Sequence, residues 1–218
     1  MEDVLDVYAR PYDPQRPVVC DDEKLVTLHA DVRESVPVAP HHPERVDYEY
    51  ERAGTANLFV SVEPLAGWRH TEVTERRTKV DFAHHLKWLA DEQYPAAEVI
   101  ILVDDNLNTH DLSVLYLVYP PEEARRLVQR FAVHHTPKHG SWLNMAEIEI
   151  HEIERNVLQR RVPDRATLAR QIAALEHDRN VAKATIRWRF RTEEARQKMR
   201  RVYPLLVEAG DSSNCEPI

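Results

Sequence analysis

The spacing of apolar and polar positions changes along the chain, and each spacing predicts a type of element. "VVCDDE" (18–23) is a β-branched run that ends in acids, and it predicts a buried strand. "RVDYEYER", "ANLFVSVEP" and "WRHTEVTER" are β-rich runs separated by Ala53-Gly54 and by Leu65-Ala66-Gly67. Breaks that contain glycine between such runs predict turns, so we expect antiparallel hairpins here.

From Thr78 the apolar positions recur at helical spacing until Pro95. Thr78 and Asp81 have the spacing of a capping box, which marks a helix start. Helices are also predicted at "PPEEARRLVQRF", which opens with proline and acids, and at "SWLNMAEIEIHEIERNVLQ" and "DRATLARQIAALEHD", the last behind an Asp164 N-cap. The chain thus alternates helices and strands in its second half.

"AEVIILVDD" (97–105) shows no alternation, which is typical of a strand covered on both faces in the parallel part of a sheet. "FAVHHTP" (131–137) is again strand-like. The predicted fold is therefore α/β, with a mixed sheet of antiparallel hairpins and parallel strands flanked by helices.

The chain length and the positions of proline-rich and polar segments predict one main domain. The 218 residues, of which 43% are hydrophobic, can bury one good core. We expect residues 1–16, which carry Pro11 and Pro14, to be a linker with little regular structure, and residues 17–204 to form the domain. "SVPVAPHHPERV" (35–46) predicts a loop, and the polar segment 205–218 predicts a disordered tail.

Composition restricts the partners. No window approaches the roughly 18 apolar residues of a membrane span, and the acidic, proline-bearing start is unlike a signal peptide, so we expect a cytoplasmic protein without a membrane partner. The net charge of −8 counts against nucleic acid. Residues 179–201, however, hold 9 basic against 2 acidic residues. That segment is either a basic face for a polyanion or the solvated surface of an amphipathic element.

Three groups of carboxylates lie where predicted elements begin or end. They are Asp21, Asp22 and Glu23 after the first strand, Asp104 and Asp105 after the buried strand, and Glu147 and Glu149 at the start of a late helix. Ligands collect at the carboxyl ends of strands in open α/β sheets. Converging carboxylates need a cation, and two Mg²⁺ or Mn²⁺ ions would suit in-line phosphoryl displacement. Caps and solvent contacts are the alternative roles, and periodicity alone does not choose within each group.

Three blocks of the chain together resemble a known family. "VVCDDE", "LVDDNLNTH" and "HHTPKHGSWLNMAEIE", in this order, resemble the signature blocks of DDE transposases of the mariner superfamily, specifically its bacterial insertion-sequence branch. The connecting segments 46–78 and 163–180 also resemble that branch, so the likeness covers residues 1–204. It implies a ribonuclease H-like fold, two divalent ions and cut-and-paste DNA transposition into TA dinucleotides.

The resemblance also selects among the acids. The aspartate just before the glutamate of "DE" is Asp22, the one before Asn106 is Asp105, and the acid three residues after Asn144 is Glu147. It therefore implies that Asp22, Asp105 and Glu147 are the catalytic residues and metal ligands. Asn144 has a supporting role on this reading.

Other residues are expected to contact DNA or to order the site. Asn106, Asn108 and His110 are expected to order the loop after the buried strand, and one of them to hydrogen-bond a phosphate or a metal-bound water. Capping of the loop is the simpler alternative. Lys138 and His139 resemble a contact to the substrate strand. Trp142 is expected to pack in the core under the helix start, with stacking on a base as the alternative.

"RWRFR" adds a second set of candidate DNA contacts. Arg187, Arg189 and Arg191 alternate with Trp188 and Phe190, so an extended backbone would place the three guanidiniums on one face, as a phosphate-binding strip requires. A solvated edge strand or a helix end is the alternative.

The expected function is metal-dependent strand cleavage and transfer on transposon ends and target DNA, in the bacterial cytoplasm at the nucleoid. The resemblance leaves open a homodimer in a synaptic complex and a separate helix-turn-helix partner, because such transposases carry N-terminal recognition modules and this chain begins in what resembles the linker after them. A split-frame product, a truncated gene or an isolated domain would each explain that start. The alternatives are a non-catalytic remnant that binds DNA or full-length transposase, and a structure-specific nuclease.

Overall fold

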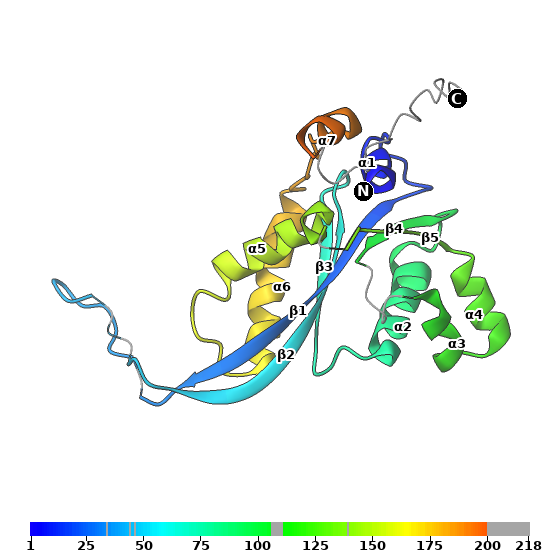
Figure 1. Cartoon of the computed structure of the whole chain (residues 1–218). Coiled ribbons are helices and arrows are strands. Elements are labelled where there is room, and N and C mark those ends of the chain that lie inside the picture. Colours follow the sequence, from blue (N-terminus) through cyan, green and yellow to red (C-terminus); the bar gives the residue numbers. More distant parts are fainter. Residues whose placement is uncertain (34, 44, 46, 106–110, 139, 200–218) are drawn as a thin grey trace, which may run out of the picture.

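The computed structural model of the chain describes residues 1–33, 35–43, 45, 47–105, 111–138 and 140–199. One five-stranded mixed sheet lies at its centre, in the order β3-β2-β1-β4-β5 (Figure 1). The strands are β1 (Val18–Asp31), β2 (Tyr50–Glu63), β3 (Trp68–Thr74), β4 (Ile100–Asp104) and β5 (Phe131–His135). β1 to β3 pair antiparallel, and β4 is parallel to both β1 and β5. The predicted mixed sheet is confirmed.

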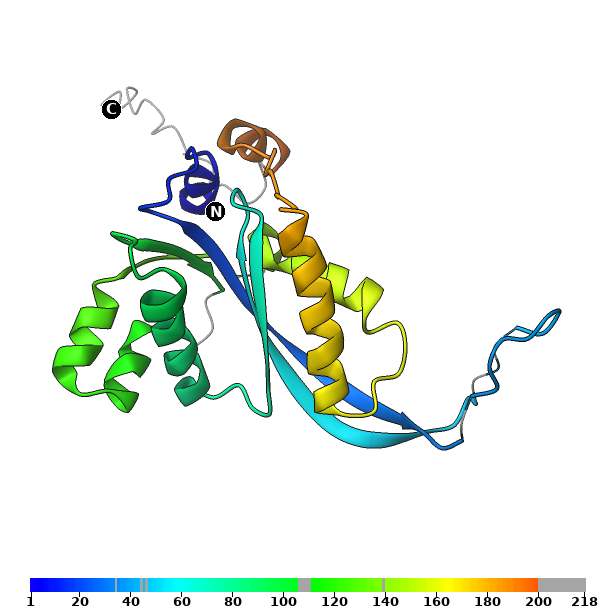
Figure 2. The ribbon, with the colours of Figure 1, turned by 180° about the vertical axis from the view of Figure 1, so that it is seen from behind.

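Helices cover both faces of the sheet (Figures 1 and 2). One face carries α2 (Lys79–Trp88), α3 (Leu115–Val118) and α4 (Pro121–Val128), and the other carries α5 (Ala146–Asn156) and α6 (Arg165–Val181). α1 (Glu2–Tyr8) and α7 (Thr192–Lys198) lie at one end. Phe59 and Leu102 pack in the core on the α2 side, whereas Leu58 and Val60 pack on the side of α5 and α6. The alternation of strand side chains thus supplies two cores.

Local signals placed several elements correctly. Thr78 and Asp81 form the predicted capping box of α2, the Asp164 side chain caps α6, and Pro121 opens α4. The predicted turn at Gly67 also forms. Its φ is +70°, and a Cβ there would lie 2.6 Å from the backbone of Lys183, so glycine is required.

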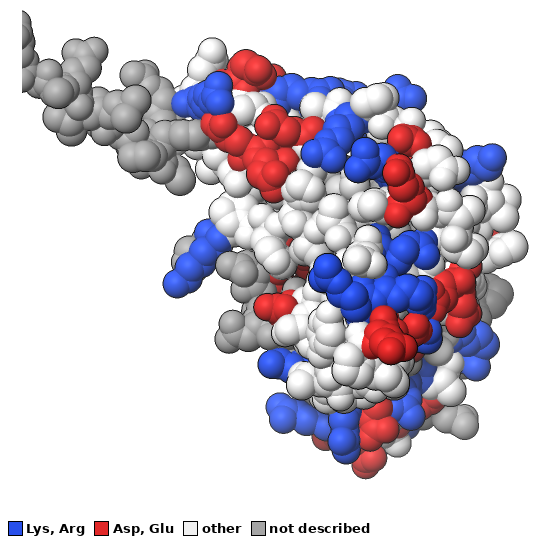
Figure 3. Space-filling view, turned by 90° about the vertical axis from the view of Figure 1, so that its right-hand side faces the viewer, with Lys and Arg blue, Asp and Glu red and all other residues white. Residues whose placement is uncertain are grey.

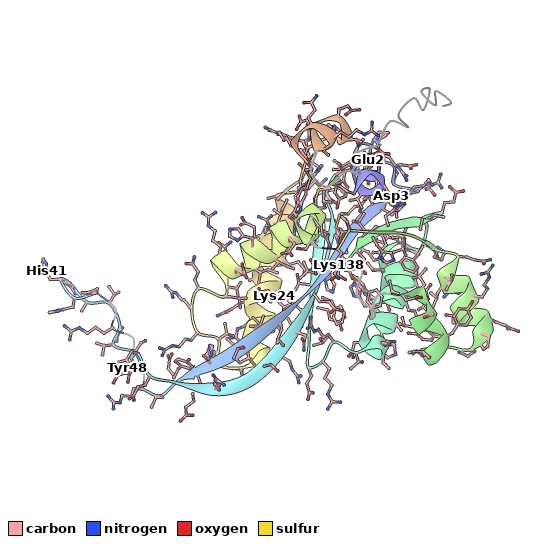
Figure 4. All side chains as sticks on the ribbon, viewed as in Figure 1. Glu2, Asp3, Lys24, His41, Tyr48 and Lys138 are labelled. Atoms are coloured by element: carbon pink, nitrogen blue, oxygen red, sulfur yellow. The ribbon has the colours of Figure 1, made fainter. Side chains whose placement is uncertain are left out.

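The turn predicted at Ala53-Gly54 is wrong. β2 runs without interruption through both residues, and its antiparallel partner is β1, which is itself 14 residues long. The register shifts between Leu28 and His29, opposite Gly54, whose φ is +103°. The glycine therefore serves a β-bulge in a long ribbon. The predicted loop after β1 forms an arm beyond that ribbon, with His41 near its tip (Figure 4).

Residues 1–16 were expected to hold little regular structure, and this is wrong for residues 2–8. α1 buries Val4, Leu5, Val7 and Tyr8, each at most 8% exposed. The prolines that suggested a linker all follow the helix, so they end it and do not prevent it. The Tyr8 hydroxyl donates to the Leu143 carbonyl at 2.8 Å, which ties α1 to the segment before α5.

Other boundaries differ from prediction more modestly. The helix expected from residue 141 begins at Ala146, behind a short 3₁₀ turn. α3 had no predicted counterpart, because a helix of 4 residues shows too few periods to be recognised. α7 (7 residues) lies within residues 179–201, for which an amphipathic helix was one of the alternatives. The predicted tail, 205–218, lies outside the described residues. In the described part of the chain, no helix has the length and apolar character needed to cross a bilayer.

Candidate active site

Strand alternation sorts the acidic doublets onto opposite faces of the sheet. β1 and β4 are parallel neighbours, with Cys20 beside Val103, and the aspartates follow directly in both strands. Cys20 and Val103 pack with Met145 and Ala146 at the start of α5. Side chains two positions further on share that face, so Asp22 and Asp105 lie on the α5 side. Asp21 and Asp104 belong to the α2 side, where both are 1% exposed.

Asn144 fixes the start of α5 against β1. Its side-chain amide donates to the Asp21 carbonyl at 2.6 Å, and its side-chain oxygen accepts from the Ala146 N–H at 3.1 Å. Glu147 follows in the first turn of α5. A buried amide thus bonds both to the strand that carries Asp22 and to the start of the helix that carries Glu147. The supporting role of Asn144 stays a prediction.

The electrostatics of Asp22 reflect both burial and neighbouring acids. Burial, with a smaller contribution from the charges of Glu147 and Asp105, raises the pKa of Asp22 to about 7, although a hydrogen bond from the Glu23 N–H at 2.8 Å lowers it. Like charges at close range disfavour ionisation. Glu147 and Asp105 thus lie within electrostatic reach of Asp22. Asp22 was expected to follow the first strand, but β1 runs on to Asp31, so Asp22 lies inside β1, just beyond its parallel pairing with β4.

The donor chemistry of these acids fits a divalent cation. Three carboxylates provide the hard oxygen ligands that Mg²⁺ and Mn²⁺ prefer, and a cation would relieve the repulsion felt by Asp22. Within the residues that the structure describes, no three His, Cys, Asp or Glu side chains are already gathered tightly enough to enclose an ion. Asp22, Asp105 and Glu147 are the residues that would hold one.

Glu149 has a different environment from Glu147, although two positions separate them. It is 2% exposed and accepts from Arg69 Nε at 3.1 Å and from Arg179 Nε at 2.8 Å. Arg69 is itself fully buried and also donates to the Gly67 carbonyl at 3.0 Å. Glu149 thus joins β3, α5 and α6 through a buried ion-pair network and does not face Asp22.

Asp21 likewise belongs to a network behind the site, which sequence reasoning missed. Its Oδ1 accepts from Ser61 Oγ and lies 3.1 Å from His85 Nε2, and all three residues are at most 1% exposed. Burial lowers the pKa of His85, but the charges of Asp21 and Glu72 outweigh burial and raise it to about 10. The only sequence signal was the doublet His84-His85, in which only the second histidine is buried.

Several predicted site residues cannot be placed. Asn106, Asn108, His110 and His139 lie outside the described residues.

Lys138 is exposed and lies in the segment between β5 and α5, near the carboxyl ends of the parallel strands (Figure 4). The turn before α5 is tight, because a Cβ on Gly140 would lie 2.6 Å from the Pro137 side chain.

The segment 186–191 has the alternation that the sequence predicted. Arg187, Arg189 and Arg191 are exposed, whereas Trp188 and Phe190 are partly buried. The segment forms no regular helix or strand. It therefore presents three guanidiniums outward while its aromatic side chains face the protein.

Trp142 is not a core residue, contrary to expectation. It is 44% exposed, although its ring lies beside that of Trp188, with centroids 6.4 Å apart. Trp142 was expected to pack under the start of the helix, but α5 begins only at Ala146 and Trp142 lies in the short 3₁₀ turn before it.

The face formed by α3, α4 and β5 shows no large area of one charge. Figure 3 shows basic and acidic side chains interspersed over this side of the molecule. Lys87 and Arg126 are paired there with Asp91 and Glu123. The described basic side chains on this face are thus largely matched by acids.

The mixed five-stranded sheet flanked by helices is a ribonuclease H-like fold, with acidic residues just beyond the parallel pairing of β1 with β4. A family model described as DDE superfamily endonuclease matches residues 17–169. The chain belongs to this family. No curated protein matches it significantly.

Solved structures of mariner Mos1 complexes resemble the chain. The Mos1 paired end complex with Mg has a TM-score of 0.57 at 16% identity and covers 89% of this chain. The Mos1 paired end complex with Mn has a TM-score of 0.48 at 16% identity and covers 85%. The chain spans 58% and 60% of the lengths of these two proteins. At this identity the first likeness shows a shared fold, that of a transposase catalytic domain.

Proposed function

We propose that this chain is the catalytic domain of a mariner-superfamily transposase, of the bacterial insertion-sequence branch, which cleaves and transfers DNA strands in cut-and-paste transposition. The observation that carries the proposal is that Glu147, in the first turn of α5, and Asp105, after β4, both act electrostatically on the partly buried Asp22. The match to the DDE endonuclease family and the fold likeness to a mariner paired end complex with Mg support it.

Asp22, Asp105 and Glu147 would hold two divalent cations, Mg²⁺ or Mn²⁺. When bound, such a pair activates a water and stabilises the leaving oxygen of an in-line displacement. In cleavage the water oxygen attacks phosphorus and the bond to the 3′ oxygen breaks, which leaves a 3′-hydroxyl and a 5′-phosphate. The water gives up a proton to solvent, and the leaving oxygen takes one.

Strand transfer repeats this displacement. The new 3′-hydroxyl attacks a phosphodiester of the target, so one phosphodiester bond forms as another breaks and no external energy source is required. The role of the chain's own residues is to hold the two reacting strands in line. A TA target step fits this role, because pyrimidine–purine steps kink easily.

Basic residues around the site are the proposed DNA contacts. Lys138 and the exposed strip of Arg187, Arg189 and Arg191 would bind phosphates, together with His139. Asn106 and His110 would order the loop beside Asp105, and Asn144 positions Glu147. We extend the proposal to a homodimer that holds two transposon ends, to a separate helix-turn-helix chain that recognises them, and to the bacterial nucleoid as the place of action.

The test compares wild type with Asp105→Asn and with the control Asp178→Asn, which replaces an exposed acid on α6. Mn²⁺ titration by calorimetry and nicking of DNA that carries the terminal repeats should both be lost in Asp105→Asn and kept in the control. Retained cleavage in Asp105→Asn would sink the assignment. A folded wild-type chain that binds DNA, but neither binds Mn²⁺ nor nicks, would support the alternative of a non-catalytic DNA-binding remnant.

A further inference from the structure

Trp142 has an unusual setting for a tryptophan next to a candidate active site. Its ring lies almost parallel to that of Trp188, at an interplanar angle of 24°, and nearly edge-on to that of Phe190, with centroids 5.9 Å apart. The residue is nonetheless 44% exposed. Neighbouring aromatic rings thus support it from the protein side, while much of its surface remains open to solvent.

The open part of Trp142 borders a groove of about 410 Å³ between β1 and α5. The groove is lined by Trp142 and Ile150, by polar side chains that include Lys24 and His151, and by Glu147. This volume lies within the range of small-molecule sites and is large enough for a nucleobase and its sugar. Figure 4 shows Lys24 where β1 passes α5.

The groove is lined by Glu147 and Glu154 as well as by one cation, Lys24, which is the side chain available to a phosphate. Lys24 Nζ pairs with Glu154 at 2.6 Å but remains 27% exposed, so it can also reach a phosphate. The arginines of the 187–191 strip lie in the same segment as the Trp188 ring that supports Trp142. An exposed tryptophan with a lysine on the same groove, supported by a segment that carries exposed arginines, is a combination used to bind single-stranded nucleic acid.

We propose that this groove is a nucleobase subsite, in which an unpaired base of the DNA strand next to the scissile phosphate stacks on Trp142. The inference rests on the proposed function, since Glu147 on the wall of the groove is a proposed ligand of the metal site. Every base has a π-face, so the subsite accepts any of the four bases. It binds a base that has left the duplex, and it holds the adjacent phosphate near the acids.

The test measures binding of a fluorescent duplex with a single-stranded overhang, in the presence of a chelator so that no strand is cut. A second duplex carries abasic sites in the same overhang. The variants are Trp142→Ala, Trp142→Phe and the control Tyr116→Ala, which removes an aromatic ring that is 46% exposed on α3, away from the groove (Figure 1). Circular dichroism and thermal melting show whether each variant is folded.

We expect Trp142→Ala to weaken binding about tenfold, because stacking on an aromatic side chain contributes strongly to binding of each base. Trp142→Phe should keep most of the affinity, and Tyr116→Ala should bind like wild type. Abasic sites should weaken wild-type binding by a similar factor but leave Trp142→Ala unchanged, since the same contact is already lost. If Trp142→Ala does not fold, the comparison of Trp142→Phe with wild type on both duplexes applies.

An equal abasic penalty in wild type and Trp142→Ala would overturn the subsite, as would failure of folded wild type to bind the overhang. A dimer that Trp142→Ala dissociates in sedimentation, with no dependence on the bases, would also overturn it, because a second copy would then occupy the groove. Failure of the proposed function can be distinguished from failure of the subsite. If Asp105→Asn still nicks DNA, the proposed function is wrong, whatever the comparison of the abasic and ordinary duplexes shows.

Discussion

The two glutamates of "AEIEI" provide a sharp test of the structure, because neighbouring acids of the same type have opposite surroundings. Glu149→Ala removes the shared acceptor of Arg69 and Arg179. Arg69 is fully buried. In the variant its guanidinium would still donate a hydrogen bond to the Gly67 carbonyl, but it would lose the negative charge that neutralises it. Glu147→Ala removes a half-buried acid that raises the pKa of Asp22, so it relieves repulsion.

Magnitudes follow from this difference in burial. Removing one partner of a buried ion pair costs about 3–5 kcal/mol of unfolding free energy. With a urea dependence of roughly 2–3 kcal/mol per molar for a domain of this size, the unfolding midpoint of Glu149→Ala should fall by about 1–2 M. Glu147→Ala should stay within about 0.5 kcal/mol of wild type or be slightly more stable.

Equilibrium unfolding in urea, followed by circular dichroism, measures both variants beside wild type. Glu149→Gln is the matched control, since it keeps an acceptor without the charge and should fall between the two. If Glu147→Ala is as stable as wild type but no longer nicks DNA, Glu147 serves the reaction and Glu149 serves the stability of the fold. The reasoning is refuted if Glu149→Ala unfolds at the wild-type midpoint, or if Glu147→Ala is destabilised as strongly.

Two buried groups predict a dependence of stability on pH. In the metal-free folded chain the pKa of Asp22 is about 7, against 3.8 for an ordinary aspartate, so between about pH 4 and 7 the folded state binds a proton that the unfolded state has lost. The unfolding free energy of wild type, measured relative to Asp22→Asn, should therefore fall as the pH rises from about 4 to 7. Saturating Mn²⁺ should abolish that fall, and parallel curves without metal would contradict it. His85, with a pKa of about 10, stabilises fully below about pH 6.5, and this contribution is lost as the pH rises through 10. His85→Gln should remove this loss of stability at alkaline pH, and the exposed control His84→Gln should keep it. Urea unfolding at pH values from 6 to 10 measures the effect. If the unfolding free energy of His85→Gln falls with pH as steeply as that of wild type, the proposed interaction of His85 with Asp21 and Glu72 is wrong.

Sequence reasoning succeeded where the deciding interactions are local or continuous along the chain. The apolar run that ends in Asp104 predicted the doubly covered β4, and the cap at Thr78 predicted the start of α2. It failed where a distant segment decides. Gly54 was predicted to turn the chain but serves a bulge, because β1 is long enough to pair with residues on both sides of it.

The sequence by itself determined the mixed sheet, the helices α2, α4, α5 and α6, and the acids at the end of β4 and the start of α5, because periodicity and capping depend on neighbours within a few residues. It did not predict the length of β1, which runs past Asp22 to Asp31. Only the tertiary structure decided which member of each group meets which partner. Alternation gives β1 two faces, but packing of α2 and α5 determines that Asp21 meets His85 and that Asp22 meets Glu147. In the same way, Arg69 and Arg179 bind Glu149 on one side of α5, so Glu149 stabilises the fold while Glu147 remains on the side of Asp22. These contacts join residues far apart in the chain, so no local pattern specifies them.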